Sequence, residues 1–141
     1  LVNGKAWVAQ NGCRLICDPA FTLYYDGAMG GGVTVRAEYN INNINQDIVL
    51  STDSSNFLTV FNIAARGSYH TNFSFSNNNL FNQCAWISAR DTNNVRSTGI
   101  LVLTKHDLPN RIISGTFEFT LAKPGCDTIR ATNGRFDGRL Y

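Results

Sequence analysis

Several features that mark membrane proteins and nucleic-acid-binding proteins are scarce in this sequence. Among 141 residues, no apolar run approaches the roughly 20 residues that span a bilayer as a helix. The nine Arg and three Lys are spread along the chain without a basic block, and the net charge is only +2. We therefore expect neither a membrane-spanning helix nor a nucleic-acid partner.

Residues suited to catalysis are also few. General acid-base and nucleophilic catalysis usually recruit His, Cys or paired carboxylates held by neighbouring groups. His70 lies on the polar face of a predicted strand, and His106 stands beside Asp107 in a predicted loop, where adjacent residues rarely orient one another as a triad requires. No G-x-S-x-G sequence marks a hydrolase nucleophile. We expect both histidines on the surface and no catalytic residue.

The sequence does not indicate a metal site. Structural zinc sites usually present close pairs such as C-x-x-C, whereas here only Cys13 and Cys17 are near each other in the chain. The acidic residues form no D-x-D-x-D calcium loop, although turns near Asp47, Asp53 and Asp91 carry oxygen ligands. We therefore expect no metal and no cofactor.

Four cysteines, Cys13, Cys17, Cys84 and Cys126, stand in a chain rich in Asn, Thr and Ser and poor in Glu and Lys. This combination favours disulfides in an oxidising, extracytoplasmic compartment. In one strand Cys13 and Cys17 would lie about 13 Å apart, so they can bridge each other only across a turn. We favour that local bridge together with a Cys84–Cys126 disulfide. The alternative pins the N-terminal cysteines to Cys84 or Cys126.

Alternating apolar and polar residues predict short β-strands through most of the chain. This two-residue period covers residues 33–39, 69–75 and 117–121, with Phe117 and Phe119 in the core. Residues 100–103 are apolar on both faces, as in a strand in the middle of a sheet. Shorter runs, AWVA, FTLYY and CAWISA, have the same character. The stretch SSNFLTVFNIAA has a helical alternative, but its β-branched and aromatic content favours a strand.

Turn residues separate these runs at a spacing of roughly ten residues. We therefore predict an all-β fold, an antiparallel β-sandwich, with a closed antiparallel barrel as the alternative. No linker or repeat divides the chain, so we predict a single extracytoplasmic domain over residues 1–141. The first residues show no signal peptide and no initiator Met, and we expect that any leader has been removed.

An Asn-Gly pair, Asn133-Gly134, interrupts the predicted last strand. The strands RIISGTFEFTLA and TIRATNGRF flank KPGCD, which predicts a hairpin. A glycine inside a strand pattern usually marks a bulge, so we predict a positive φ at Gly134. Ile129 and Ala131 then point into the core, and the bulge lets Phe136 return to it. The alternative is a tight turn at the Asn-Gly pair.

Four residues are weak candidates for a ligand surface. Trp7 and Trp86 are suited to stacking on sugar rings, but their aliphatic neighbours favour packing in the core or at its rim. Arg135 and Asp137 flank Phe136 and therefore share the outward face. We expect them to pair across strands or to hold the bulge, with ligand binding as the alternative.

Five short motifs follow one another along the chain: VNGKAW at residues 2–7, GSY at 67–69, GILVLTKHD at 99–107, ISGTFEF at 113–119 and TNGRFD at 132–137. Together they resemble a family of small secreted or lipid-anchored envelope proteins of Bacteroidetes-type bacteria, most of which have no known function. The resemblance implies a β-rich domain at the cell envelope, held by a lipid anchor upstream of this sequence. It implies no activity. The two cysteines in NGCRLICD depart from the shared pattern.

These observations predict a non-enzymatic cell-envelope or secreted protein with a binding or structural role. Its expected partner is a glycan or another envelope protein, and contact with the membrane is expected only through the lipid anchor. A carbohydrate-binding accessory module is the alternative, and a hydrolase is a distant third.

Overall fold

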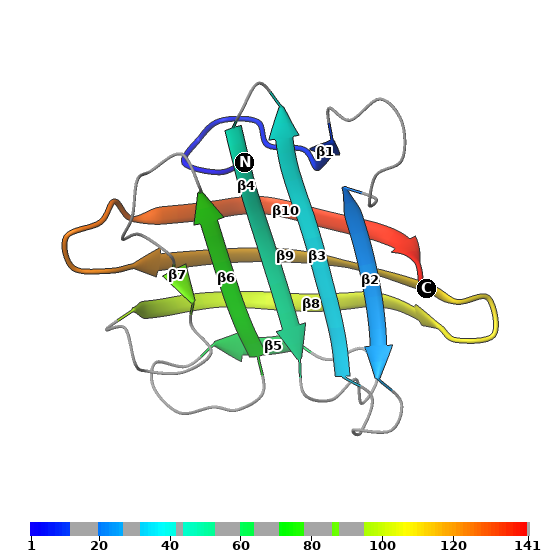
Figure 1. Ribbon diagram of the computed structural model, residues 1–141. Coiled ribbons are helices and arrows are strands. Elements are labelled where there is room, and N and C mark those ends of the chain that lie inside the picture. Colours follow the sequence, from blue (N-terminus) through cyan, green and yellow to red (C-terminus); the bar gives the residue numbers. More distant parts are fainter. Residues whose placement is uncertain are drawn as a thin grey trace.

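The computed structural model describes residues 1–11, 20–26, 32–41, 44–52, 60–63, 71–77, 86–87 and 95–140. All regular structure in these residues is β-strand, as the sequence predicts (Figure 1). The strands are β1 (Gln10–Asn11), β2 (Phe21–Asp26), β3 (Gly32–Ile41), β4 (Ile44–Thr52), β5 (Val60–Ile63), β6 (Thr71–Asn77), β7 (Trp86–Ile87), β8 (Arg96–Asp107), β9 (Ile112–Ala122) and β10 (Ile129–Arg139). Within the described residues, no helix is long and apolar enough to cross a membrane.

The strands form two separate sheets. One sheet has the order β1-β3-β4-β6-β7, and β2 pairs with β3 as well. The other has the order β10-β9-β8-β5. All pairings are antiparallel except that of β1, which runs parallel to β3. Figure 1 shows the sheets stacked face to face with their long strands crossing steeply, so the predicted sandwich is confirmed and the barrel is not formed.

The core lies between the two sheets and is built from alternate residues of each strand. The six-stranded sheet contributes Leu23, Val33, Val35, Ile48, Leu50 and Phe75, and the four-stranded sheet contributes Leu101, Leu103, Ile113, Phe119, Leu121, Ile129, Ala131 and Phe136, with Leu140 just beyond β10. Each large apolar side chain buried in this way contributes about 1.5–3 kcal/mol to folding. The opposite face of β3 is polar, where Arg36 and Glu38 form an ion pair of 2.7 Å.

Strand β10 contains the predicted bulge. Ala131 pairs with Phe119 and Gly134 pairs with Phe117, so two residues stand opposite Glu118 alone. Ile129, Ala131 and Phe136 are all buried, as predicted. The predicted positive φ at Gly134 is wrong, because the left-handed residue is Asn133, with a φ of 53°.

Glycine is needed at Gly134 for space. A Cβ there would lie 2.5 Å from the ring of Phe117, which fills the gap that the missing side chain leaves. Phe119 is buried as predicted, whereas Phe117 is only partly buried against the core.

The first residues do not form the short strand predicted for AWVA. Val2 forms a bridge with Ala131 of β10, and Gln10–Asn11 pairs with β3 in the other sheet. The residues between must therefore pass from one sheet to the other and cannot pair along a single strand. In SSNFLTVFNIAA, residues 60–63 form β5, which confirms the favoured strand there; the remainder of that stretch lies outside the described residues.

Candidate functional site

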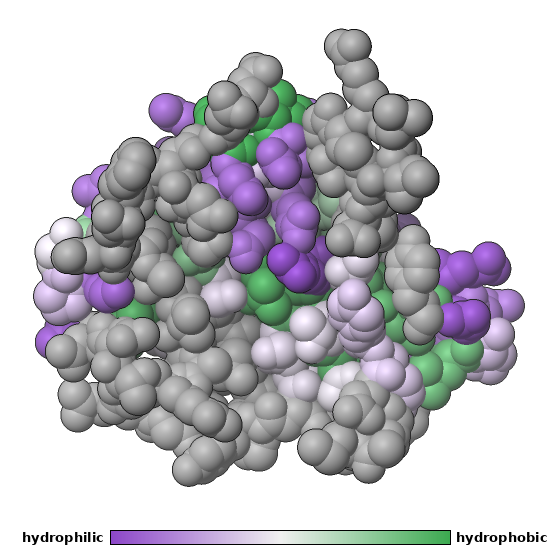
Figure 2. Space-filling view, in the orientation of Figure 1, coloured by the Kyte–Doolittle hydropathy of each residue, from purple (hydrophilic) through white to green (hydrophobic). Residues whose placement is uncertain are grey.

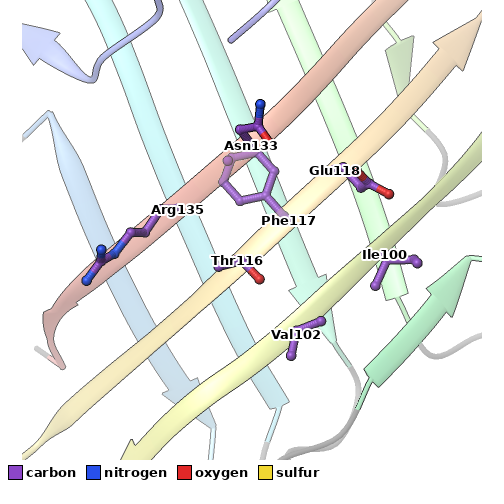
Figure 3. A pocket seen from close by; sticks show the side chains of 8 residues that line it. Ile100, Val102, Thr116, Phe117, Glu118, Asn133 and Arg135 are labelled. Atoms are coloured by element: carbon purple, nitrogen blue, oxygen red, sulfur yellow. The ribbon is translucent and has the colours of Figure 1, made fainter.

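A shallow groove of about 470 Å³ lies on the outer face of the four-stranded sheet (Figure 3). Its side chains come from three adjacent strands: Ile100 and Val102 from β8, Thr116 and Glu118 from β9, and Asn133 and Arg135 from β10. Val102 pairs with Thr116, and Ile100 pairs with Glu118. The antiparallel register therefore sets aliphatic side chains beside polar ones on one surface.

The bulge shapes the β10 side of this groove. Its extra residue changes the alternation of β10, so Asn133 and Arg135 are both exposed at the groove while Phe136 turns inward. Gly134 lies between them, and the ring of Phe117 occupies the space where its side chain would be. The bulge thus brings an amide and a guanidinium group to the same side of the groove.

The described lining of the groove offers apolar side chains and four kinds of polar group: a hydroxyl, a carboxylate, an amide and a guanidinium. Ile100 and Val102 are half-buried, whereas Glu118 and Arg135 are exposed. Neither charged group forms an ion pair with any residue in the described part of the chain. The carboxylate, the guanidinium and the Asn133 amide are therefore available to direct a bound molecule. The described lining contains no His or Cys that would serve as a nucleophile or base.

Arg135 and Asp137 share the outward face of β10, as predicted. The carboxylate of Asp137 accepts a hydrogen bond of 2.6 Å from Ser114 Oγ on β9. This is the expected pairing across strands for Asp137, and Arg135 instead lines the groove.

Trp7 packs at the rim of the core, as the favoured interpretation has it. Its Nε1 donates a hydrogen bond of 3.0 Å to Gln46 Oε1, and its ring centroid lies 6.4 Å from that of Tyr39. These contacts are with the six-stranded sheet, so the structure does not bring Trp7 together with Arg135. Trp86 belongs to β7, and its side chain lies outside the described residues.

The expected surface position of His106 is wrong. Both of its ring nitrogens are buried, and its ring centroid lies 5.4 Å from that of Tyr25 on β2. The cause is a second bulge: Leu103 pairs with Gly115 and Lys105 pairs with Ser114, which leaves Thr104 as an extra residue. This shift turns His106 inward. His70 lies outside the described residues.

Asp107 has a structural partner in the β8–β9 hairpin. Its carboxylate accepts hydrogen bonds from the Asn110 backbone at 3.2 Å and from Asn110 Nδ2 at 2.9 and 3.0 Å. These bonds hold the pKa of Asp107 below its ordinary value of 3.8, and Lys105 Nζ, 3.9 Å away, acts in the same direction. Asp107 thus holds the turn and does not orient His106.

Cys126 is the one cysteine in the described part of the chain, and it is not a free thiol. It lies in the predicted turn between β9 and β10, where its N–H donates to the Lys123 carbonyl at 3.0 Å. Cys13, Cys17 and Cys84 lie outside the described residues. Of the residues that are described, no three His, Cys, Asp or Glu side chains are grouped to hold a metal.

Of the groove residues, the sequence pointed only to Arg135 as a ligand candidate, and the others, among them Ile100, Val102 and Glu118, were missed. The available signal was the run apolar on both faces at residues 100–103, because only one of those faces enters the core. Comparison of the chain with protein-family models, with curated proteins and with solved structures found no match.

Proposed function

We propose that this protein is a non-enzymatic binding domain of the cell envelope or a secreted protein. Its ligand surface is the outer face of the four-stranded sheet. The observation that carries the proposal is the groove in which half-buried Ile100 and Val102 lie beside Glu118 and Arg135, whose charges have no ion-pair partner among the described residues. Covering the aliphatic pair gains about 25 cal/mol per Å² of apolar surface, and the polar groups fix the orientation of the ligand.

A glycan or another envelope protein is the partner that this proposal favours. A carbohydrate-binding module is the specific alternative, because a carboxylate, a guanidinium and the Asn133 amide suit the hydroxyl groups of a sugar. The aromatic residue in the described lining, however, is Phe117. Its ring packs against the core and therefore offers little surface on which a sugar ring could stack. A hydrolase is a distant third.

The location outside the cytoplasm is part of the proposal, as is the lipid anchor upstream of this sequence. Four cysteines in a chain of this composition support an oxidising compartment, and the state of Cys126, which is not a free thiol, supports it further. The five ordered motifs support membership of the envelope-protein family described above.

A glycan array and a crosslinking capture from envelope extracts test the binding role. We expect a partner whose binding falls at least about tenfold in Glu118→Gln and in Arg135→Gln. Arg96→Gln is the matched control: Arg96 is exposed at the start of β8 and does not line the groove, so it should bind as the parent does.

Four outcomes separate the alternatives. Groove-dependent binding of a sugar selects the carbohydrate-binding module, and groove-dependent capture of an envelope protein selects a protein partner. Binding that all three variants retain would rule out the groove. Hydrolysis of a generic ester or glycoside by the parent, lost in Glu118→Gln, would refute the non-enzymatic assignment.

A further inference from the structure

A second depression, of about 400 Å³, lies at the end of the sandwich where the start of β2, the β8–β9 turn and the end of β10 meet. Its described lining consists of Phe21, Arg111, Arg139 and Leu140. These elements come together at the right of Figure 1, and Figure 2 shows hydrophilic side chains gathered where the hairpin protrudes. It shares none of its described lining residues with the groove.

Neither arginine at this depression has its charge balanced by a described carboxylate. In the part of the chain that the structure describes, neither guanidinium forms an ion pair. Two carboxylates on the adjoining described strands are engaged elsewhere: Asp107 with Asn110 and Lys105, and Asp137 with Ser114. Two arginines therefore line one cavity, and neither forms an ion pair with a carboxylate of the described residues.

Arg111 is held at this depression in a strained backbone conformation. Its φ is 60°, a left-handed conformation that glycine adopts without the steric conflict of a Cβ. Its N–H donates to the Leu108 carbonyl at 3.0 Å, and its carbonyl accepts from the Leu140 N–H at 2.7 Å. The second bond holds Arg111 next to the end of β10, where Arg139 lies. Glycine would be the more stable residue at this position of the turn.

The apolar part of the cavity is formed by Phe21 and Leu140. Leu140 is buried, and Phe21 packs against the core, so both provide a firm wall. Gly138 lets this wall form, because a Cβ there would lie 2.6 Å from the ring of Phe21. The described lining thus combines two basic residues with two apolar ones.

We propose that this pocket binds the carboxylate of a small organic acid whose ring or apolar body lies against Phe21 and Leu140. Guanidinium groups match a carboxylate through paired N–H donors, and two of them balance and orient one such group. The volume of about 400 Å³ lies within the range of small-molecule sites. This site is independent of the groove and of the function proposed for it.

Benzoate is the probe for this proposal, followed by NMR of the backbone amides of Arg111 and Leu140 and of the arginine Nε–H groups. We expect saturable shifts with a dissociation constant of about 1 mM. Inorganic phosphate, an oxyanion without an apolar body, should bind more weakly, and benzyl alcohol, a ring without charge, should not saturate.

Arg111→Gly separates binding from folding, because glycine suits the left-handed backbone. We expect it to melt at or above the temperature of the parent while its affinity for benzoate falls at least about tenfold. Arg139→Gln should lose affinity to a similar extent. Arg96→Gln makes the same change of charge away from the pocket and should bind as the parent does.

The contrary outcomes are equally specific. Benzoate shifts that survive in Arg111→Gly and Arg139→Gln, or that do not saturate in the parent, would overturn the site. Phosphate binding as tightly as benzoate would overturn the assignment to an organic acid. Benzyl alcohol binding as tightly as benzoate would show an apolar pocket with no carboxylate recognition.

Discussion

Asn133 and Gly134 carry separate parts of the bulge in β10. Asn133 adopts the left-handed backbone, with a φ of 53°, which Asn tolerates better than most residues. Because Gly134 has no side chain, the ring of Phe117 can lie against its backbone. An Asn-Gly pair within a strand indicates a bulge. The pair does not indicate which of the two residues adopts the left-handed backbone and which leaves space for a neighbouring ring.

We therefore predict different effects at these two positions. Gly134→Val should lower the free energy of unfolding by about 1 kcal/mol or more, because the new side chain collides with Phe117. Asn133→Gly should change it by less than about 0.5 kcal/mol, because glycine fits a positive φ. Urea unfolding of both variants measures the difference. A Gly134→Val variant as stable as the parent would show that this contact is not close in solution.

Asp107 gives the hairpin a dependence on pH. The hydrogen bonds from Asn110 lower its folded-state pKa below 3.8, so folding favours the ionised carboxylate. Its contribution to stability is therefore present above pH 3.8 and is lost as the pH falls through the lower folded-state pKa. We expect an NMR titration of the carboxyl carbon to give a value below 3.8 and Asn110→Ala to raise it. An unchanged pKa in Asn110→Ala would contradict this cause.

At the scale of whole elements, β9 shows how one alternating pattern can cover two environments. Phe117 and Phe119 share the inner face, and their rings stack with centroids 6.0 Å apart. Phe119 lies in the core with 2% of its surface exposed, whereas Phe117 lies beside the bulge and is only partly buried. The alternation predicts the shared face, but the depth depends on the neighbouring strand.

Replacing each phenylalanine with alanine should reveal this difference. Phe119→Ala should cost roughly 3–5 kcal/mol, the range for a large aromatic side chain removed from a core. Phe117→Ala should cost less, since its ring already has partial exposure, and it should also reduce the penalty of Gly134→Val in the double variant. Denaturant unfolding of the set gives all these values. Equal losses for the two single variants would contradict the difference in burial.

β8 shows why the candidate groove could be predicted only in part. The run at residues 100–103 identifies a strand inside a sheet, and the structure places it between β9 and β5. The apolar run alone does not indicate which face of the strand enters the core, because both faces are apolar. The bulge at Thr104 has no Gly or Pro to mark it, so alternation alone sends His106 outward. The strands and the bulge in β10 were therefore predictable, whereas the groove depends on pairings between distant strands.

At the scale of the whole molecule, the N-terminal segment ties the two sheets together. Leu1 and Thr132 exchange backbone hydrogen bonds of 2.7 and 2.9 Å, and Asn3 does the same with Arg130 through its backbone N–H and its side-chain oxygen. Because Gln10–Asn11 joins the opposite sheet, residues 1–11 form a strap between the sheets. The strap also covers part of the free edge of β10, which protects it from pairing with other chains.

Asn3 is the residue on which we expect the strap to depend most. Its side-chain oxygen accepts from the Arg130 N–H at 2.7 Å, and its φ of 48° is left-handed. Asn3→Ala removes the bond and fits the backbone less well, so it should cost about 1 kcal/mol. Lys5→Ala is the control, because the side chain of Lys5 is exposed. Equal stability of the two variants would show that the strap does not hold the fold.

The positions of the cysteines favour a disulfide between the two sheets, which would also be expected in the proposed oxidising compartment. β7, which begins two residues after Cys84, lies in one sheet, and the turn with Cys126 joins strands of the other; Figure 1 shows both at the same end of the molecule. A Cys84–Cys126 disulfide would therefore link the sheets. Closing a loop of this length contributes roughly 4 kcal/mol by the chain-entropy estimate.

We predict no free thiols in the native protein produced under oxidising conditions, and peptide mapping that finds Cys84 joined to Cys126 and Cys13 joined to Cys17. Cys84→Ser and Cys126→Ser should then lose the same stability, since either change opens the same bridge. Cys13→Ser should lose less, because the loop to Cys17 is short. Four reactive thiols would contradict both the disulfides and the export, whereas a bridge from Cys13 or Cys17 to Cys126 would replace the local pairing with the long-range one.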